Sequence, residues 1–308
     1  MLVFKTTYSA CFVIILYALS GTLLGAYATE SSVDPQRNRS GIQLGAVKAA
    51  IVELENGETL YSKHSDWITP IASITKLMTA LIVMQGPQDL EEWVVIPTPD
   101  RETSKNAYSR IRIGSQLKRR DLLRLALMSS ENLAAYTLAA SYPGGVTAFV
   151  DKMNSTAKAL GMNNTHFVDA SGLSVGNVST AADLVKLVQA VSRYDNIREY
   201  STTPRYTAYF RKPRYSLGYG NTNRLVHRQS WDIELSKTGY ITEAGRCLVL
   251  LSKFEGREVA MVLLDAFGKH TPIGDAGRVK RWLATGNSGT VAGAALQYEM
   301  NKAKEYPN

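Results

Sequence analysis

The chain has 308 residues, of which 45% are hydrophobic and 20% charged, so one large or two small globular domains with a real core are expected. A formal charge of +8 allows nucleic acid, anionic wall polymer or lipid head groups as partners and selects none of them. The histidines have no H-E-x-x-H or similar ligand spacing, so a zinc peptidase has no support, and neither a metal nor a cofactor is expected. They are His64, His166, His227 and His270.

The first 28 residues have the pattern of a secretory signal peptide. Lys5 lies in a short polar start, an apolar stretch runs from Cys11 to Leu24, and Ala26-Tyr27-Ala28 is a small-x-small cleavage site. The alternative is an uncleaved membrane anchor, but the apolar stretch is short for a bilayer span. We therefore predict a periplasmic protein without a stable membrane anchor after cleavage, and export argues against nucleic acid as a partner. Cys247 would then be the only cysteine, which excludes an internal disulfide.

The mature chain begins with a polar, turn-rich segment, residues 29–42, which predicts a loose lead-in. Asn56-Gly57 is the strongest short hairpin signal in the chain. The runs on either side of it, Gly45 to Val52 and Glu58 to Tyr61, predict two antiparallel strands. This hairpin opens the domain that we expect to span residues 43–286.

The next segment, Ile71 to Met84, is apolar at nearly every position and predicts a helix buried on almost all sides, which Gly86-Pro87 ends. Lys76 is unusual there, because burial favours the neutral form of a lysine. Ser73 lies three residues earlier, so both side chains would share one face of the helix. A lysine with a lowered pKa could take the proton of a serine, although an S-x-x-K spacing also occurs by chance on helices whose lysine reaches water.

From residue 88 to about 224 the pattern is mixed and mostly helical, which predicts a helical lobe inserted into a sheet domain. Four helices are expected, near Arg119 to Met128, Asn132 to Ser141, Thr147 to Leu160 and Thr180 to Ser192. Ser130 lies between the first two of these helices. We expect it to face Ser73 across a cleft.

Strands return after residue 231. They are expected at Ile233 to Thr238, Arg246 to Lys253 and Glu258 to Leu264, and a helix follows from about Asp275 to Leu283. The whole pattern predicts an α+β fold, an antiparallel sheet flanked by helices with the inserted lobe. Residues 287–308 form a tail that is too weakly amphipathic for a membrane anchor.

Two further motifs form a set with Ser73 and Lys76. Ser130-Glu131-Asn132 follows an amphipathic helix, and Lys237-Thr238-Gly239 closes an alternating strand. S-x-x-K, then S-x-N, then K-T-G is the signature of serine β-lactamases and penicillin-binding proteins. Each motif is weak by itself, but the ordered triple is a strong signal.

On these motifs the chain resembles the low-molecular-mass penicillin-binding proteins, the D-alanyl-D-alanine peptidases of bacterial cell-wall maintenance. The resemblance covers nearly all of the predicted mature chain and includes Ala49 to Val52, Pro70, Thr165 to Leu173 and Lys237 to Cys247. The Ser-Ser-Glu-Asn and Lys-Thr-Gly-Tyr-Ile versions are similar to the D-alanyl-D-alanine endopeptidase branch. Plain carboxypeptidases more often carry glycine where Glu131 stands.

The resemblance implies catalytic roles for five residues. Ser73 would be the nucleophile and Lys76 its general base. Ser130 would relay a proton to the leaving amine, Asn132 would bind both Lys76 and a substrate amide, and Lys237 would supply a positive charge.

The same resemblance implies a substrate-binding set around the third motif. Lys237 and Thr238 would bind the substrate carboxylate, and Gly239 would let the substrate backbone approach the strand. The backbone N–H of Tyr240 would form the oxyanion hole together with that of Ser73.

The implied function is hydrolysis of D-alanyl bonds in peptidoglycan stem peptides through an acyl-enzyme, with a preference for D-Ala–diaminopimelate cross-links. The alternatives are a D-Ala-D-Ala carboxypeptidase, a β-lactamase and a catalytically silent penicillin-binding scaffold. The partners implied are peptidoglycan and, as covalent inhibitors, β-lactam antibiotics. The Glu-x-x-Leu-Asn pattern of the commonest β-lactamases is absent between Asn132 and Lys237, which predicts that bound penicillin leaves slowly.

Overall fold

The computed structural model describes residues 41–99 and 109–305. The predicted signal peptide and nearly all of the predicted lead-in lie outside the described residues. Within them, no helix has both the length and the apolar character needed to cross a membrane.

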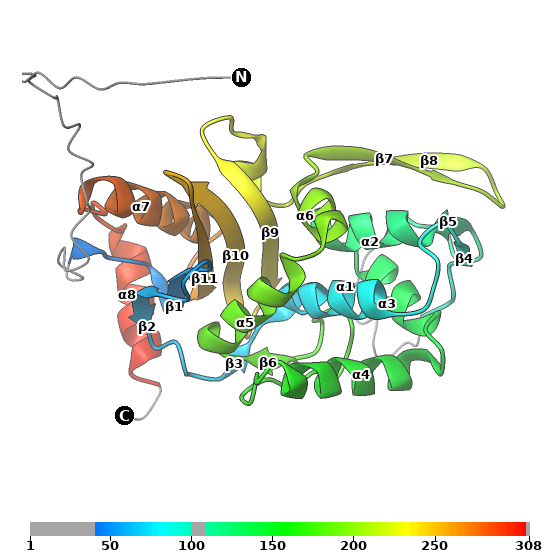
Figure 1. The fold of residues 1–308 in the computed structure, drawn as a ribbon, viewed down its shortest axis with the longest axis horizontal. Coiled ribbons are helices and arrows are strands. Elements are labelled where there is room, and N and C mark those ends of the chain that lie inside the picture. Colours follow the sequence, from blue (N-terminus) through cyan, green and yellow to red (C-terminus); the bar gives the residue numbers. More distant parts are fainter. Residues whose placement is uncertain (1–40, 100–108, 306–308) are drawn as a thin grey trace, which may run out of the picture. The chain divides into compact units, whose positions relative to one another are not determined.

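A five-stranded antiparallel sheet forms the centre of the domain, in the order β2-β1-β11-β10-β9 (Figure 1). Its strands are β1 Ala46–Glu53, β2 Thr59–Lys63, β9 Asp232–Ile241, β10 Gly245–Phe254 and β11 Arg257–Ala266. The predicted hairpin joins β1 and β2, and β1 then pairs with β11 from the far end of the chain. All eight residues of β1 are buried because it has a neighbour on each edge and helices on both faces.

Helices cover the two faces of the sheet (Figure 1). On one face lie α7, Thr271–Thr285, and α8, Gly293–Ala303. Side chains alternate across a strand, so Val262 of β11 joins the core under the helical lobe whereas Leu263 joins the core under α7. The sheet therefore separates two apolar cores.

The helical lobe packs on the other face of the sheet. Its helices are α2 Arg119–Met128, α3 Asn132–Ala140, α4 Gly145–Ala159, α5 Ala181–Val191 and α6 Asp195–Thr202. Helix α1, Lys76–Gln85, precedes the lobe segment in sequence and packs among these helices. Eight of the ten residues of α1 are buried, as its apolar sequence predicts. The four predicted lobe helices are present, with ends within two residues of those expected.

Some elements differ from the sequence prediction. A hairpin of β7, Arg205–Phe210, and β8, Tyr215–Gly220, lies where mostly helical structure was expected. Its inner side chains alternate with exposed ones, so the period of two was present but was masked by a run of basic and aromatic residues. Two short strands, β4 Trp93–Val95 and β5 Gln116–Lys118, and the helices α6 and α8 were not predicted either.

Strand β9 is longer than predicted. It was expected to end at Thr238, but it continues through Gly239 to Ile241, and the turn to β10 lies at residues 242–244. Gly239 pairs with Cys247 of β10, so partner hydrogen bonds keep the third motif extended rather than turned.

Candidate active site

Ser73 lies in a short 3₁₀ turn, Ala72–Thr75, that leads directly into α1. The predicted α-helix thus begins at Lys76 rather than at Ile71. Ala72 has a φ of 47°, a left-handed conformation that residues other than glycine seldom adopt. The Thr75 hydroxyl donates to the Ala72 carbonyl at 2.8 Å and closes the turn. The serine therefore sits on a sharp bend at the helix entrance.

Two glycines pack against this bend. A Cβ at Gly172 would lie 1.9 Å from the Ala72 carbonyl oxygen, and Gly172 has a positive φ of 81°. A Cβ at Gly239 would lie 3.0 Å from the Ile71 carbonyl oxygen and 3.2 Å from the Ser73 nitrogen. Neither position can accept a side chain unless the serine turn moves, so Gly239 has a packing reason beside its expected role toward substrate.

Lys76 is fully buried beside the serine. Its Nζ donates to Ser73 Oγ at 2.8 Å, to Asn132 Oδ1 at 2.7 Å and to the Ser171 carbonyl at 2.5 Å. Burial lowers the pKa of Lys76 to about 7, although the negative charges of Asp169 and then Glu131 act in the opposite direction. A large share of this lysine is therefore neutral near pH 7.

The three partners of Lys76 direct its lone pair. A neutral amine has two N–H groups and one lone pair, and the oxygens of Asn132 and Ser171 can only accept hydrogen bonds. They hold the two N–H groups, so the lone pair faces Ser73 Oγ, which can donate its own proton. This geometry is suited to general-base activation of a serine.

The loop that supplies the Ser171 carbonyl is fixed by Asp169. The carboxylate of Asp169 accepts from the backbone N–H groups of Ser171 and Gly172, both at 2.6 Å, and from Ser174 at 2.8 Å. Asn177 binds the backbone of Asp169 and the Thr75 hydroxyl, which ties the loop to the serine turn. The sequence assigned no role to this loop. Its signal was the aspartate two residues before Ser-Gly, a pattern typical of a side-chain-capped turn.

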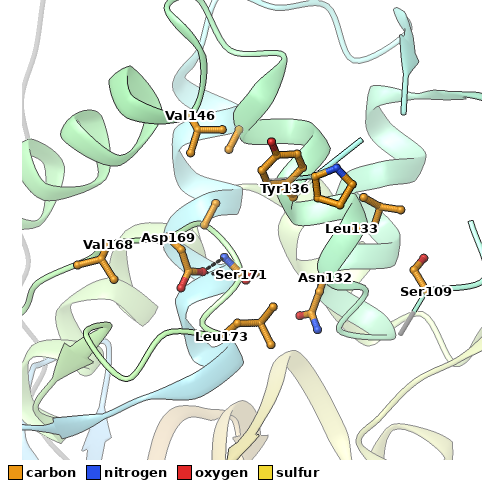
Figure 2. A pocket seen from close by; sticks show the side chains of 12 residues that line it. Ser109, Asn132, Leu133, Tyr136, Val146, Val168, Asp169, Ser171 and Leu173 are labelled. Carbon is orange, nitrogen blue, oxygen red and sulfur yellow. Dashed lines mark hydrogen bonds between the residues drawn. The ribbon is translucent and has the colours of Figure 1, made fainter. Parts of the chain in front are cut away.

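A small apolar pocket of about 70 Å³ lies between this loop and α3. Figure 2 shows Asn132, Leu133 and Tyr136 on one side and Asp169, Ser171 and Leu173 on the other. The pocket borders the two residues that hold the Lys76 amine, and it was not predicted.

Ser130 lies at the break between α2 and α3. It has a φ of 60°, and the Glu131 side chain that follows caps α3 by accepting from Leu133 N at 3.3 Å. This places Ser130 Oγ 2.9 Å from Lys237 Nζ. The cap gives the residue that departs from the carboxypeptidase pattern a structural role. Burial also raises the pKa of the Glu131 carboxyl.

Lys237 is buried in β9, and its hydrogen-bond partners among the described residues, Ser130 Oγ and the Thr238 carbonyl, are both neutral. Burial, and next the charge of Lys76, hold the pKa of Lys237 well below its usual value. The Thr238 hydroxyl lies 2.6 Å from that of Thr222, which follows the β7–β8 hairpin. Thr222 was not predicted, because the hairpin that brings it to the site was not recognised.

These residues meet at one cleft of about 520 Å³. Ser73, Ser130, Asn132, Thr238 and Tyr240 line it, and the two lysines lie behind its wall. The structure thus brings together all the residues singled out by the sequence. Among residues 41–99 and 109–305, no three His, Cys, Asp or Glu side chains are grouped to hold a metal.

Several known proteins are similar to this chain in sequence and in fold. The sequence profile of the family described as D-alanyl-D-alanine carboxypeptidase matches residues 33–268. The D-alanyl-D-alanine endopeptidases of Escherichia coli and Pseudomonas aeruginosa are 47% and 46% identical to the chain over 263 residues, which cover 85% of this chain and of each relative. The cefotaxime-bound structure of penicillin-binding protein D2 from Listeria monocytogenes has a TM-score of 0.67 at 31% identity, over 78% of this chain and 97% of that one.

The profile match spans most of the chain, and the two endopeptidases are nearly half identical to it over most of their length. The curated relatives that resemble the chain less, such as the carboxypeptidase DacF of Bacillus subtilis at 30% identity, carry the same D-alanyl-D-alanine peptidase activity in their names. The chain belongs to this family of serine D-alanyl-D-alanine peptidases.

Proposed function

We propose that the chain is a periplasmic endopeptidase that hydrolyses D-Ala–diaminopimelate cross-links in peptidoglycan through an acyl-enzyme on Ser73. The observation that carries the chemistry is the 2.8 Å distance between the buried Lys76 Nζ and Ser73 Oγ. The preference for cross-links rests on the two relatives named endopeptidases and on the sequence versions around Glu131 and Tyr240.

In the acylation step, Ser73 Oγ attacks the carbonyl carbon of the substrate D-alanine while its proton passes to Lys76 Nζ. The carbonyl oxygen becomes an oxyanion, which the backbone N–H groups of Ser73 and Tyr240 stabilise. Collapse of this intermediate breaks the C–N bond. Ser130 Oγ gives its proton to the leaving amine and takes up in its place the proton that Lys76 received from Ser73, so Lys76 is neutral again before deacylation; the hydrogen bond with Lys237 holds Ser130 in position.

In the deacylation step, water attacks the acyl carbonyl and the same groups act again. Lys76 takes the proton of the water, the oxyanion forms in the same place, and its collapse releases Ser73 Oγ, which recovers a proton from Lys76. Asn132 holds the amine in position throughout by its 2.7 Å hydrogen bond.

Lys237 would bind the carboxylate next to the leaving amine. Its pKa is lowered because the ammonium is buried without an anion, and an incoming carboxylate would remove this penalty. The Thr238 hydroxyl, held by Thr222, adds a donor at the same place. The positive charge expected of Lys237 would thus be established by substrate binding.

β-Lactams would acylate Ser73 through the same attack, as supported by the antibiotic-bound structure of the Listeria relative. The peptidase unit would occupy residues 43–286, with the lobe at about 88–224 and the tail at 287–308, after removal of a signal peptide ending near Ala28. Export of this kind would place the site next to its polymer.

The test is to incubate the purified mature protein and a Ser73→Ala variant with cross-linked muropeptide dimers, with pentapeptide monomers and with penicillin, following products and covalent adducts by mass. Splitting of dimers that depends on Ser73 is the expected result. Loss of one D-alanine from monomers alone would make the protein a carboxypeptidase, and rapid penicillin turnover would make it a β-lactamase. Covalent penicillin binding without peptide turnover would favour a silent scaffold.

A further inference from the structure

The cleft continues beyond the catalytic serine onto the other face of strand β9. In the β9–β10 register, Thr238 lies opposite Leu248 and Tyr240 lies opposite Arg246. Leu248 belongs to the core under α7, so these four side chains project toward α7 and not toward the helical lobe. β9 is an edge strand of the sheet and lies beside helix α6 of the lobe (Figure 1). The residues that line the cleft run from Ser73 to Tyr240 and Arg246 on this other face.

The wall of this second part of the cleft is cationic. Arg224, Arg246 and Lys269 line it, and none of the described residues that line the cleft is an aspartate or glutamate. No ion pair with a carboxylate of the described residues is found for these three side chains. Three such cations in one concave wall create a positive potential that attracts carboxylates. The positive potential comes from these grouped side chains and not only from the net charge of the chain.

Arg246 is held in a fixed orientation. Its guanidinium carbon lies 3.6 Å from the centre of the Tyr240 ring, directly across the strand pair. Stacking on an aromatic face restricts the guanidinium plane and leaves the N–H edge available for a carboxylate. No carboxylate of the described residues forms an ion pair with Arg246. Arg246 is thus positioned by Tyr240 but has no carboxylate partner among the described residues.

Arg224 is fixed by a capped turn instead of by ring stacking. It opens a short 3₁₀ turn, Arg224–His227, which Asn223 caps by accepting from Leu225 N at 3.0 Å. The Asn223 side chain also donates to Ser236 Oγ of β9 at 2.9 Å, and Leu225 is buried in the core under α7. A rigid turn therefore presents the exposed arginine to the cleft.

The proposed mechanism indicates which part of a substrate lies against the cationic wall of the cleft. The amine that leaves takes its proton from Ser130, which is hydrogen-bonded to Lys237, so the leaving group lies on the side of Ser130 and Thr238. The cleft surface beyond Thr238 then faces the leaving peptide. Free D-alanine would end at Lys237 and Thr238, whereas a stem peptide released from a cross-link extends further and carries additional carboxylates.

We propose that Arg246, stacked on Tyr240, and Arg224 form a carboxylate-binding subsite for the leaving stem peptide. The subsite makes the cleft selective for cross-linked peptides over terminal D-alanine. A planar guanidinium with a free edge binds a carboxylate through two parallel hydrogen bonds, which gives direction as well as attraction. This inference rests on the proposed endopeptidase function and names the residues that set its specificity.

The test uses the mature protein with an Arg224→Gln/Arg246→Gln double change. The control is Arg228→Gln, which removes an exposed charge four residues along from Arg224 and outside the cleft wall. Three quantities are measured for each protein: kcat/KM for muropeptide dimers, kcat/KM for pentapeptide monomers, and the rate constant of Ser73 acylation by penicillin. Thermal unfolding checks that each variant is folded.

The double variant should lose about tenfold or more in kcat/KM for dimers, corresponding to about 1.4 kcal/mol, with the monomer and penicillin values unchanged. Its dimer cleavage should also depend less steeply on salt than that of the wild type, because charged contacts have been removed. Arg246→Lys should recover part of the loss, since it restores the charge but not the planar edge. Arg228→Gln should behave as wild type.

An equal loss for all three substrates would show a structural role only and would overturn the inference, as would unchanged dimer cleavage by the double variant. A wild-type protein that trims pentapeptides but leaves dimers intact would overturn the proposed endopeptidase function itself. The two failures are therefore distinguishable.

Discussion

Two of the fully buried lysines have opposite surroundings. Lys48 lies in strand β1, and its Nζ is 2.8 Å from the carboxylate of Asp265. The same carboxylate accepts a hydrogen bond from the Tyr298 hydroxyl of α8. Lys76 lies at the cleft with three neutral partners, and burial lowers its pKa to about 7. The comparison teaches that burial does not make a lysine reactive by itself. The difference is that Lys48 is hydrogen-bonded to a carboxylate, whereas the hydrogen bonds given for Lys76 all go to neutral oxygens.

Replacement of Lys76 should show the largest effect. A Lys76→Met protein should acylate with penicillin about 10²–10⁴-fold more slowly, because the proton of Ser73 has no acceptor. Thermal unfolding checks that the variant is folded. The acylation rate is followed by mass spectrometry of the covalent adduct. Wild-type acylation by this variant would assign the proton to another group.

Replacement of Lys48 should lower the stability of the fold and leave the acylation rate unchanged. Lys48→Met leaves Asp265 buried without its cation, so the free energy of unfolding in urea should fall by about 3–5 kcal/mol. The folded protein should keep its acylation rate. A Lys48→Met/Asp265→Asn pair should recover part of the stability, and failure to recover any would argue against the ion pair as the cause.

The pH dependence distinguishes the two lysines in the unaltered protein. Acylation requires neutral Lys76, so its rate constant should rise about tenfold per pH unit below about 7 and level off above it. Unfolding returns Lys76 to its ordinary, higher pKa, so the unfolded chain binds more protons between the two values. The contribution of Lys76 to stability therefore increases as pH rises from about 7 toward 10.5. A rate that is flat from pH 5 to 9 would contradict the assignment of Lys76 as base.

The smallest expected effect comes from Glu131. Its charge raises the pKa of Lys76, so Glu131→Gln should move the midpoint of the acylation profile to lower pH. The amide can still cap α3, which should preserve the fold. A midpoint that stays in place or moves upward would show that Glu131 does not act on Lys76 through its charge.

The sequence was most informative where a pattern is local. Helix α2 has the predicted ends because its apolar residues recur on one face, and the three motifs named the side chains that meet at the cleft. The role of the Ser171 carbonyl was not foreseen, because the Asp169 pattern indicates a turn but not which side chain its backbone oxygen will meet. Thr222 and the Lys48–Asp265 pair were missed because each depends on segments far apart in the chain, joined only by the fold.

The pairing of β1 with β11 has a consequence for when the enzyme becomes active. Ala46 lies opposite Ala266, so the sheet is complete only after the last third of the chain has joined it. A chain that crosses a membrane from its N-terminus brings Ser73 and Lys76 across long before Lys237. During that interval the nucleophile lacks both its third motif and the strand that packs on its turn. Under the export proposed above, the site would therefore be complete only after the strands around Lys237 have joined the sheet.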